Sequence, residues 1–242
     1  MGYFVFKGKK SSDFGLMVAA APDQGGAQRQ VDRIPVAGRN GALLIDRGRY
    51  EDIVCVYAVG IKVKRGEIAE YAGKIKEWLL SDVGVYRLAD TYNPAYFRKA
   101  SYAGPLDIEN VLNLGSRFAV SFTCDPFKFS FDGQRSSVLT VSGKSVTNVE
   151  MFESRPYFKV YGSGNGNLYL SGPGSNSTIQ LKNISEYVEI DSELFQVFKG
   201  STNKSNDVIM PEKWPTFATG KTVISWDGGI TKVEYIPRWC TL

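Results

Sequence analysis

Histidine is absent from this chain of 242 residues. The absence removes the side chain that activates the nucleophile in Ser-His-Asp and Cys-His enzymes. It also removes a very common metal ligand and the usual general base near neutral pH. We therefore expect no metal site and no cofactor, and no catalysis that depends on a histidine.

Cysteine is scarce, with Cys55, Cys124 and Cys240 far apart in the sequence. No Cys-x-x-Cys pair occurs, which excludes a zinc ribbon, and the odd number argues against a disulfide framework. Cys55 and Cys124 stand in apolar, strand-like runs, where a buried reduced thiol is the usual role. We predict that both remain free and buried.

Long apolar runs are also missing, and none approaches the length of a membrane span. The apolar residues Tyr3 to Phe6 are followed at once by Lys7, Lys9 and Lys10, which is the wrong order for a signal peptide. These absences predict a protein that is made and folded in a cytoplasm and has no membrane partner.

A strong excess of one charge is lacking as well, since the formal net charge is only +4. Residues 1–130 hold 18 basic and 14 acidic side chains, and residues 131–242 hold 11 of each. The basic excess is small and interleaved with acids, unlike a nucleic-acid footprint. The pattern is typical of a solvated mixed surface and predicts no nucleic-acid partner.

Aromatic residues (13%) and 25 glycines favour a mainly β fold with glycine turns. The run 50–63 is rich in β-branched residues and predicts a central strand. In 117–123, Phe118, Val120 and Phe122 alternate with small residues, which predicts a half-buried strand.

One helix is predicted over residues 66–80, where the apolar residues recur at helical spacing. We expect this stripe to pack into the core rather than to bind a cofactor. The stripe consists of Ile68, Tyr71, Ala72, Ile75, Trp78 and Leu79.

The composition becomes polar and rich in hydroxyl groups after residue 128, and we place a domain boundary near 130. Beyond it, short strands recur with turns every 8 to 12 residues and no helical pattern, which is typical of a β-sandwich. The predicted domains are 1–130, β-rich with one helix, and 131–242, a sandwich. Its predicted strands include 157–161, 168–170, 177–181, 187–190, 194–198, 222–226 and 232–236.

Two sequence patterns resemble functional motifs, one for phosphate binding and one for glycoside hydrolysis. We interpret both as structural. Gly162-x-Gly164-x-Gly166 lacks the following helix and the Lys-Ser/Thr of a phosphate loop, so we predict a hairpin turn. Carboxylates spaced by two residues share a face of a strand, as a glycosidase would need. We expect these pairs to be solvated instead. They are Asp107 with Glu109, Glu189 with Asp191, and Asp191 with Glu193.

The segment 35–52 carries a strong hairpin signal in Asn40-Gly41. We predict positive φ at Gly38 and Gly41, with Arg39 exposed between them. With the Tyr50-Glu51-Asp52 that follows, this segment resembles the N-terminal half of siphophage distal tail proteins.

The resemblance extends along the second half of the chain through the order of its motifs. Arg155-Pro156 opens a strand, and Lys213-Trp214-Pro215 and the closing Ile236-Pro237-Arg238-Trp239 follow in order. This order resembles the C-terminal, galectin-like sandwich of the same family.

The resemblance implies a structural virion protein of the tail tip, synthesised in the host bacterial cytoplasm, that catalyses no reaction. Residues 1–130 would assemble into a homo-hexameric ring from which the sandwich projects. The ring, a baseplate hub, would join the tail tube protein to the tail-associated tip protein and the receptor-binding proteins. Arg39 either contacts a neighbouring subunit through its guanidinium or only solvates the turn.

The second hypothesis is a carbohydrate-binding module that contacts host cell-wall polymers, and a third, weaker one is a small hydrolase. A galectin-like fold favours sugar binding, although fold alone does not define function. Aromatic rings could stack on a sugar, but we expect most of them to fill the core. The candidates are Trp214, Trp226, Trp239, Tyr157, Tyr161 and Tyr169.

Overall fold

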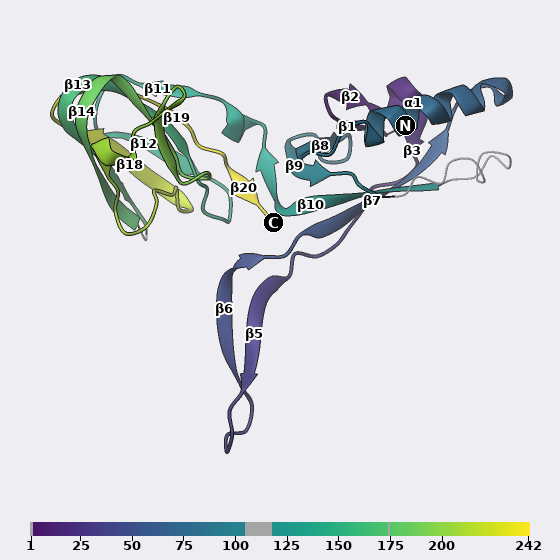
Figure 1. Cartoon of the computed structure of the whole chain (residues 1–242), viewed down its shortest axis with the longest axis horizontal. Coiled ribbons are helices and arrows are strands. Elements are labelled where there is room, and N and C mark those ends of the chain that lie inside the picture. Colours follow the sequence, from purple (N-terminus) through teal and green to yellow (C-terminus); the bar gives the residue numbers. More distant parts are fainter. Residues whose placement is uncertain (1, 105–117, 174) are drawn as a thin grey trace. The chain divides into compact units, whose positions relative to one another are not determined.

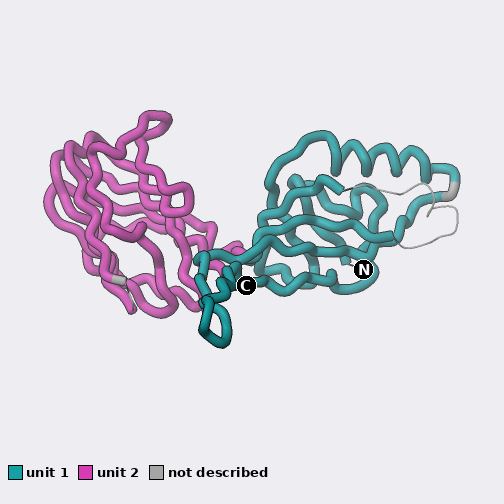
Figure 2. Tube along the Cα trace, turned by 60° about the horizontal axis from the view of Figure 1, so that its bottom comes forward, with its two compact units in different colours: residues 1–128, 242 teal, residues 129–241 magenta. Residues whose placement is uncertain are grey.

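The computed structural model of the protein describes residues 2–104, 118–173 and 175–242. It is mainly β, and the described residues contain one α-helix. The chain divides into two compact units, 1–128 with Leu242 and 129–241 (Figures 1 and 2). No helix of the described residues is long and apolar enough to cross a membrane.

Unit 1 contains a helix and most of the short N-terminal strands. Its elements are β1 (Phe4–Phe6), β2 (Lys9–Lys10), β3 (Leu16–Val18), β4 (Asp23–Gln24), β5 (Arg29–Pro35), β6 (Ala42–Tyr50), β7 (Ile53–Ile61), α1 (Ile68–Leu80), β8 (Tyr86–Asp90), β9 (Tyr96–Ser101) and β10 (Phe118–Ser130), whose last two residues belong to unit 2.

The main sheet of unit 1 has the order β2-β1-β8-β9-β10-β7-β3, with β4 also paired to β7. β7 and β10 are antiparallel neighbours, and alternate side chains of both face the core. Phe118, Val120 and Phe122 point inward, which confirms the alternation predicted for this strand. The predicted central strand is β7, an interior strand of the sheet.

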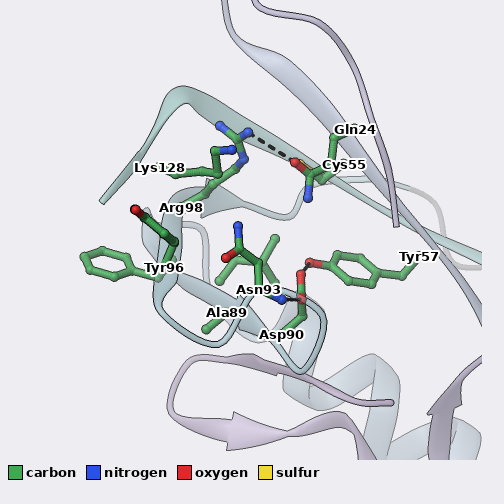
Figure 3. A pocket seen from close by; sticks show the side chains of 11 residues that line it. Gln24, Cys55, Tyr57, Ala89, Asp90, Asn93, Tyr96, Arg98 and Lys128 are labelled. Atoms are coloured by element: carbon green, nitrogen blue, oxygen red, sulfur yellow. Dashed lines mark hydrogen bonds between the residues drawn. The ribbon is translucent and has the colours of Figure 1, made fainter. Parts of the chain in front are cut away.

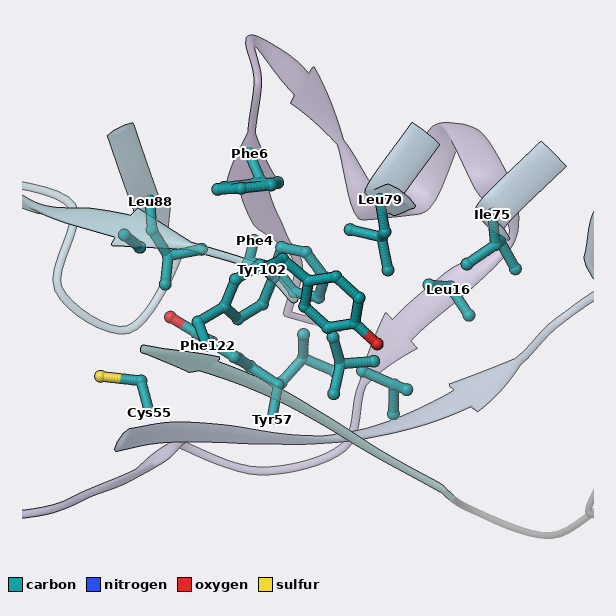
Figure 4. Close-up of a cluster of buried hydrophobic side chains, with 14 of the residues drawn as sticks. Phe4, Phe6, Leu16, Cys55, Tyr57, Ile75, Leu79, Leu88, Tyr102 and Phe122 are labelled. Carbon is teal, nitrogen blue, oxygen red and sulfur yellow. The ribbon is translucent and has the colours of Figure 1, made fainter. Parts of the chain in front are cut away.

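Helix α1 covers the inner face of this sheet, and its bounds agree with the predicted 66–80 (Figure 4). The apolar stripe buries Ala72, Ile75, Trp78 and Leu79, as expected for core packing. Trp78 stacks on Phe14, with 4.3 Å between ring centroids, and its indole N–H donates to a backbone carbonyl of β1 at 3.1 Å. Apolar burial and this hydrogen bond help to fix the helix on the sheet.

Unit 2 contains β strands and short 3-10 turns. Its strands are β11 (Ser137–Leu139), β12 (Lys144–Asn148), β13 (Tyr157–Gly172), β14 (Ser175–Asp191), β15 (Gln196–Lys199), β16 (Thr202–Asn203), β17 (Val208–Ile209), β18 (Gly220–Trp226), β19 (Ile230–Ile236) and β20 (Cys240–Thr241).

The two longest strands, β13 and β14, pair with each other along almost their whole length and belong to both layers of the core. The first half of β13 pairs with β19, and the second half pairs with β18. One sheet therefore folds over on itself. Phe158 from the first half and Leu168 from the second are both fully buried in the same core.

The strand pattern of unit 2 corrects the sequence analysis at one motif. Gly162, Gly164 and Gly166 do not form a hairpin turn; they lie inside β13, where its register shifts against β19 and β14. A Cβ on Gly162 would lie 2.2 Å from the carbonyl oxygen of Gly229. Glycine is needed here because two backbones touch, and not because the chain reverses.

Candidate functional site

β5 and β6 form a two-stranded sheet that pairs with no other described strand (Figure 1). Pairing runs to Pro35 and Ala42, and residues 36–41 form the loop at the tip. A lone two-stranded ribbon is at best marginally stable in water, because it lacks a further layer to pack against. The β5–β6 hairpin therefore needs cover from elsewhere.

The β5–β6 hairpin carries a group of exposed apolar side chains. Directly paired residues point to the same side of a ribbon, so Ile34, Leu43 and Ile45 share one face. Val31 and Leu44 lie on the other face. Six such side chains are between 39% and 58% exposed: Val31, Ile34, Val36, Leu43, Leu44 and Ile45. Exposed apolar residues gathered on one segment mark an interaction surface.

The tip of the hairpin contains Arg39, the one residue that the sequence analysis assigns to a contact. The Arg39 N–H donates to the Val36 carbonyl at 3.2 Å, and Gly38 has φ +77°, as the third residue of a type II turn requires. Gly41 has φ +85°. Both predicted positive φ angles are confirmed, and Arg39 is exposed as expected. Its role between subunits stays a prediction.

Ion pairs tie the two strands of the hairpin together. The Arg29 guanidinium donates to Asp46 at 2.9 Å, and Arg47 pairs with Asp32. The hydrogen bond to Asp46 raises the pKa of Arg29, and the same bond lowers the pKa of Asp46. These pairs leave Arg33, Arg39 and Arg49 as the remaining cations of the segment.

Unit 1 also contains a small polar cavity, of about 20 Å³, beside Arg98 (Figure 3). Arg98 is only 7% exposed; it donates to the carbonyl of Asp125 and to the side chain of Gln24, at 3.3 and 3.2 Å. Among the described residues, its Nε has no hydrogen-bond partner. The space suits one water molecule, and ligand pockets are more than ten times larger.

Two buried thiols lie near this cavity. In the register of β7 and β10, Cys55 lies opposite Phe122 and Cys124 lies opposite Ile53, so the two cysteines are diagonal neighbours on the inner face. Both are free and buried, which confirms the prediction. A hydrogen bond between the thiols lowers the pKa of Cys55 and raises that of Cys124. Nearby, Tyr57 donates to Asp90 at 2.8 Å, and burial raises the pKa of Tyr57.

The carboxylate pairs of unit 2 are engaged in structural contacts. Asp191 is buried and forms a bidentate ion pair with Arg238, at 2.7 and 2.8 Å, so the expectation that it is solvated is wrong. Glu193 also pairs with Arg238, at 3.4 Å. Glu189 accepts the Tyr157 hydroxyl at 2.6 Å. Asp107 and Glu109 lie outside the described residues.

The aromatic candidates divide into two groups. Trp214, Trp226 and Trp239 pack against the core of unit 2, as expected for most of these residues. The half-buried Tyr157, Tyr161 and Tyr169 donate hydroxyl hydrogen bonds to carboxylates, those of Glu189, Glu234 and Asp227. Each of the six candidates therefore has a structural contact within unit 2.

The comparisons with known proteins concern the fold. No family model matches the sequence, and no curated protein sequence matches it either. A crystal structure with the same fold is that of the SPP1 Dit (gp 19.1) protein, described as a paradigm of hub adsorption apparatus in Gram-positive infecting phages. The TM-score is 0.74 with 10% sequence identity, and the match covers 100% of both chains.

The apolar residues of the hairpin were not predicted to be a functional group. Residues 42–45 are a short apolar run of the kind that normally enters a core. Only the absence of a third strand beside β5 and β6 shows that these side chains stay uncovered. The sequence does contain one sign of this surface: apolar residues stand on both sides of a glycine turn that carries an arginine.

Proposed function

We propose that this protein is a structural component of a siphophage virion, the distal tail or baseplate hub protein at the tail tip. The observation that carries the proposal is the fold match to the SPP1 Dit protein, which extends over the whole of both chains. A shared domain alone would leave half of the molecule unexplained. Here both units have their counterpart in one hub protein.

In this proposal, residues 1–130 assemble into a homo-hexameric ring, and 131–242 forms a galectin-like sandwich that projects from it. The ring joins the tail tube protein to the tail-associated tip protein and the receptor-binding proteins. The β5–β6 hairpin supports such an assembly, since its apolar faces gain a cover when a neighbouring subunit packs on them. Burying an apolar side chain fully contributes about 1.5–3 kcal/mol.

The net charge of the hairpin also restricts which protein surface can bind it. The segment 29–50 holds five arginines and two aspartates, a surplus of three positive charges. Two of the arginines are paired within the hairpin. The receiving surface should therefore be apolar with acidic groups near Arg39, because a guanidinium binds a carboxylate bidentately.

The assembly is tested by native mass spectrometry of the full chain and of hairpin variants. Six copies of a 26.8 kDa chain give about 161 kDa (6 × 26.8). Leu43→Ser with Ile45→Ser should shift the population to monomer, because both apolar side chains lose their cover. Arg39→Ala should weaken assembly while the melting temperature of the monomer stays unchanged.

Val149→Ser with Met151→Ser is the matched control, since both residues are highly exposed but belong to unit 2. The control should assemble like wild type. Hairpin variants that assemble as well as wild type would refute the hairpin as the contact. If Arg39→Ala alone assembles normally, Arg39 only solvates its turn.

A further inference from the structure

The glycine-rich bend of β13 meets the turn between β18 and β19. The Gly229 N–H donates to the Asn165 carbonyl at 2.7 Å, and the Ser163 N–H donates to the Gly229 carbonyl at 3.0 Å. A Cβ on Gly229 would lie 1.7 Å from the oxygen of Ser163, and one on Gly228 would lie 2.5 Å from that of Asn165. Close contact between the two backbones fixes both segments.

An open cleft of about 450 Å³ lies at this crossing. Gly166 and Gly228 line it without side chains that could fill it. Its volume falls within the range of roughly 300–1,000 Å³ that is usual for small-molecule sites. We call it the β13 cleft. Its polar side chains are Asn165, Asn167, Gln180, Lys182 and Asp227.

Two of these side chains are held in place by the backbone. Asp227 accepts hydrogen bonds from the N–H and the side-chain amide of Asn167, both at 3.0 Å, and from the Tyr169 hydroxyl at 2.7 Å. These bonds, led by that of Tyr169, lower the pKa of Asp227. The Asn165 Oδ1 accepts the N–H of Asn183, also at 3.0 Å. The cleft thus presents an oriented carboxylate and an oriented amide.

Other groups of the β13 cleft are available to a ligand. The Asn165 Nδ2, the Gln180 amide and the Lys182 ammonium make no hydrogen bond to a described residue, and all three side chains are exposed. The Asp227 Oδ2 accepts only one bond and has a second lone pair. The cleft therefore offers both donors and acceptors to a ligand, and this combination suits hydroxyl groups, because a hydroxyl group both donates and accepts.

The charge of the β13 cleft selects among ligands that carry hydroxyl groups. Lys182 and Asp227 are its two charged side chains, and they cancel. A polyanion would meet the carboxylate of Asp227, and a cation would meet Lys182, so an uncharged ligand fits best.

We propose that the β13 cleft is a binding site for an uncharged saccharide. The carboxylate of Asp227 and the amides of Asn165 and Gln180 hold adjacent sugar hydroxyls, and Lys182 donates to a further oxygen. The proposal does not rest on the hub assignment. Every residue that it uses belongs to unit 2, and a single copy of the chain supplies the whole cleft. It gives the protein a ligand in addition to its role in assembly.

The test applies the full-length chain to a printed array of bacterial cell-surface and mammalian glycans, followed by calorimetric titration with the best-bound oligosaccharide. Wild type should bind uncharged glycans. Gln180→Ala with Lys182→Ala should weaken the affinity at least tenfold, because it removes two ligand-facing groups without breaking an internal contact. Lys144→Ala with Lys221→Ala, two exposed lysines on β12 and β18, should bind like wild type.

Three outcomes would overturn the proposal: no binding to any glycan on the array, binding to acidic glycans alone, or equal affinity in the Gln180/Lys182 variant. Circular dichroism melting of each variant verifies that the fold is kept. Native mass spectrometry of the same samples reports their assembly state separately. Loss of the ring with retained glycan binding would affect only the hub proposal.

Discussion

At the scale of single residues, Arg238 makes the most consequential contact of unit 2. It adopts a left-handed conformation, with φ +55°, and its guanidinium forms two hydrogen bonds to the buried Asp191. Asp191 also accepts the backbone N–H groups of Glu193 and Leu194, at 3.0 Å each. The pair thus ties the chain after β19 to the turn after β14.

Replacing Arg238 with methionine should lower the free energy of unfolding by about 3 kcal/mol, because a buried carboxylate is left without its counter-charge. Urea unfolding followed by tryptophan fluorescence measures this, since three of the four tryptophans lie in unit 2. Arg135→Met is the control: its ion pair with Asp132 is about 80% exposed at both ends and contributes little. Equal effects of the two substitutions would contradict this account.

At the scale of elements, the crossing of β13 with the turn before β19 depends on glycine. Gly229→Ala should destabilise unit 2 by about 3 kcal/mol or more, because the added methyl group meets the backbone at Ser163. Gly73→Ala in α1 is the matched control. A Cβ there meets nothing within 4 Å, so helix propensity should raise stability by up to about 1 kcal/mol. A Gly229→Ala protein as stable as wild type would refute the close contact.

The spacing of apolar residues predicted those helices and strands that depend mainly on nearby residues in the sequence. The helical spacing of Ile75 and Leu79 gave α1, and the alternation of Phe118 and Phe122 gave the inner face of β10. The long strands were not predictable in this way. The break at Gly164 resembles a turn in sequence, but in the structure it is a bulge that the backbone of a distant turn stabilises.

The candidate site was predictable only in part, for a similar reason. The turn signal located Arg39 and the two glycines with positive φ. Whether Leu43 and Ile45 enter a core or stay uncovered depends on what pairs with β6, and no local pattern encodes this. The β13 cleft likewise brings together Asn165 and Asp227, which are far apart in the sequence.

At the scale of the whole molecule, we propose that this chain is a tail-tip hub protein. The fold match extends over the full length of both chains at 10% sequence identity, so the two proteins share a fold although their sequences differ at most positions. Fold by itself leaves function open. The uncovered β5–β6 hairpin adds an independent reason to expect assembly, since a segment of this kind needs a partner surface.

The most direct test of this claim is immunogold electron microscopy of intact virions from the phage that encodes the chain, with antibodies raised against the full-length protein. The account predicts gold particles at the tip of the tail, where the tube ends. Antibodies preabsorbed with the purified protein serve as the control and should leave the tip unlabelled. Virions with no specific label, or with label confined to the head, would contradict the account.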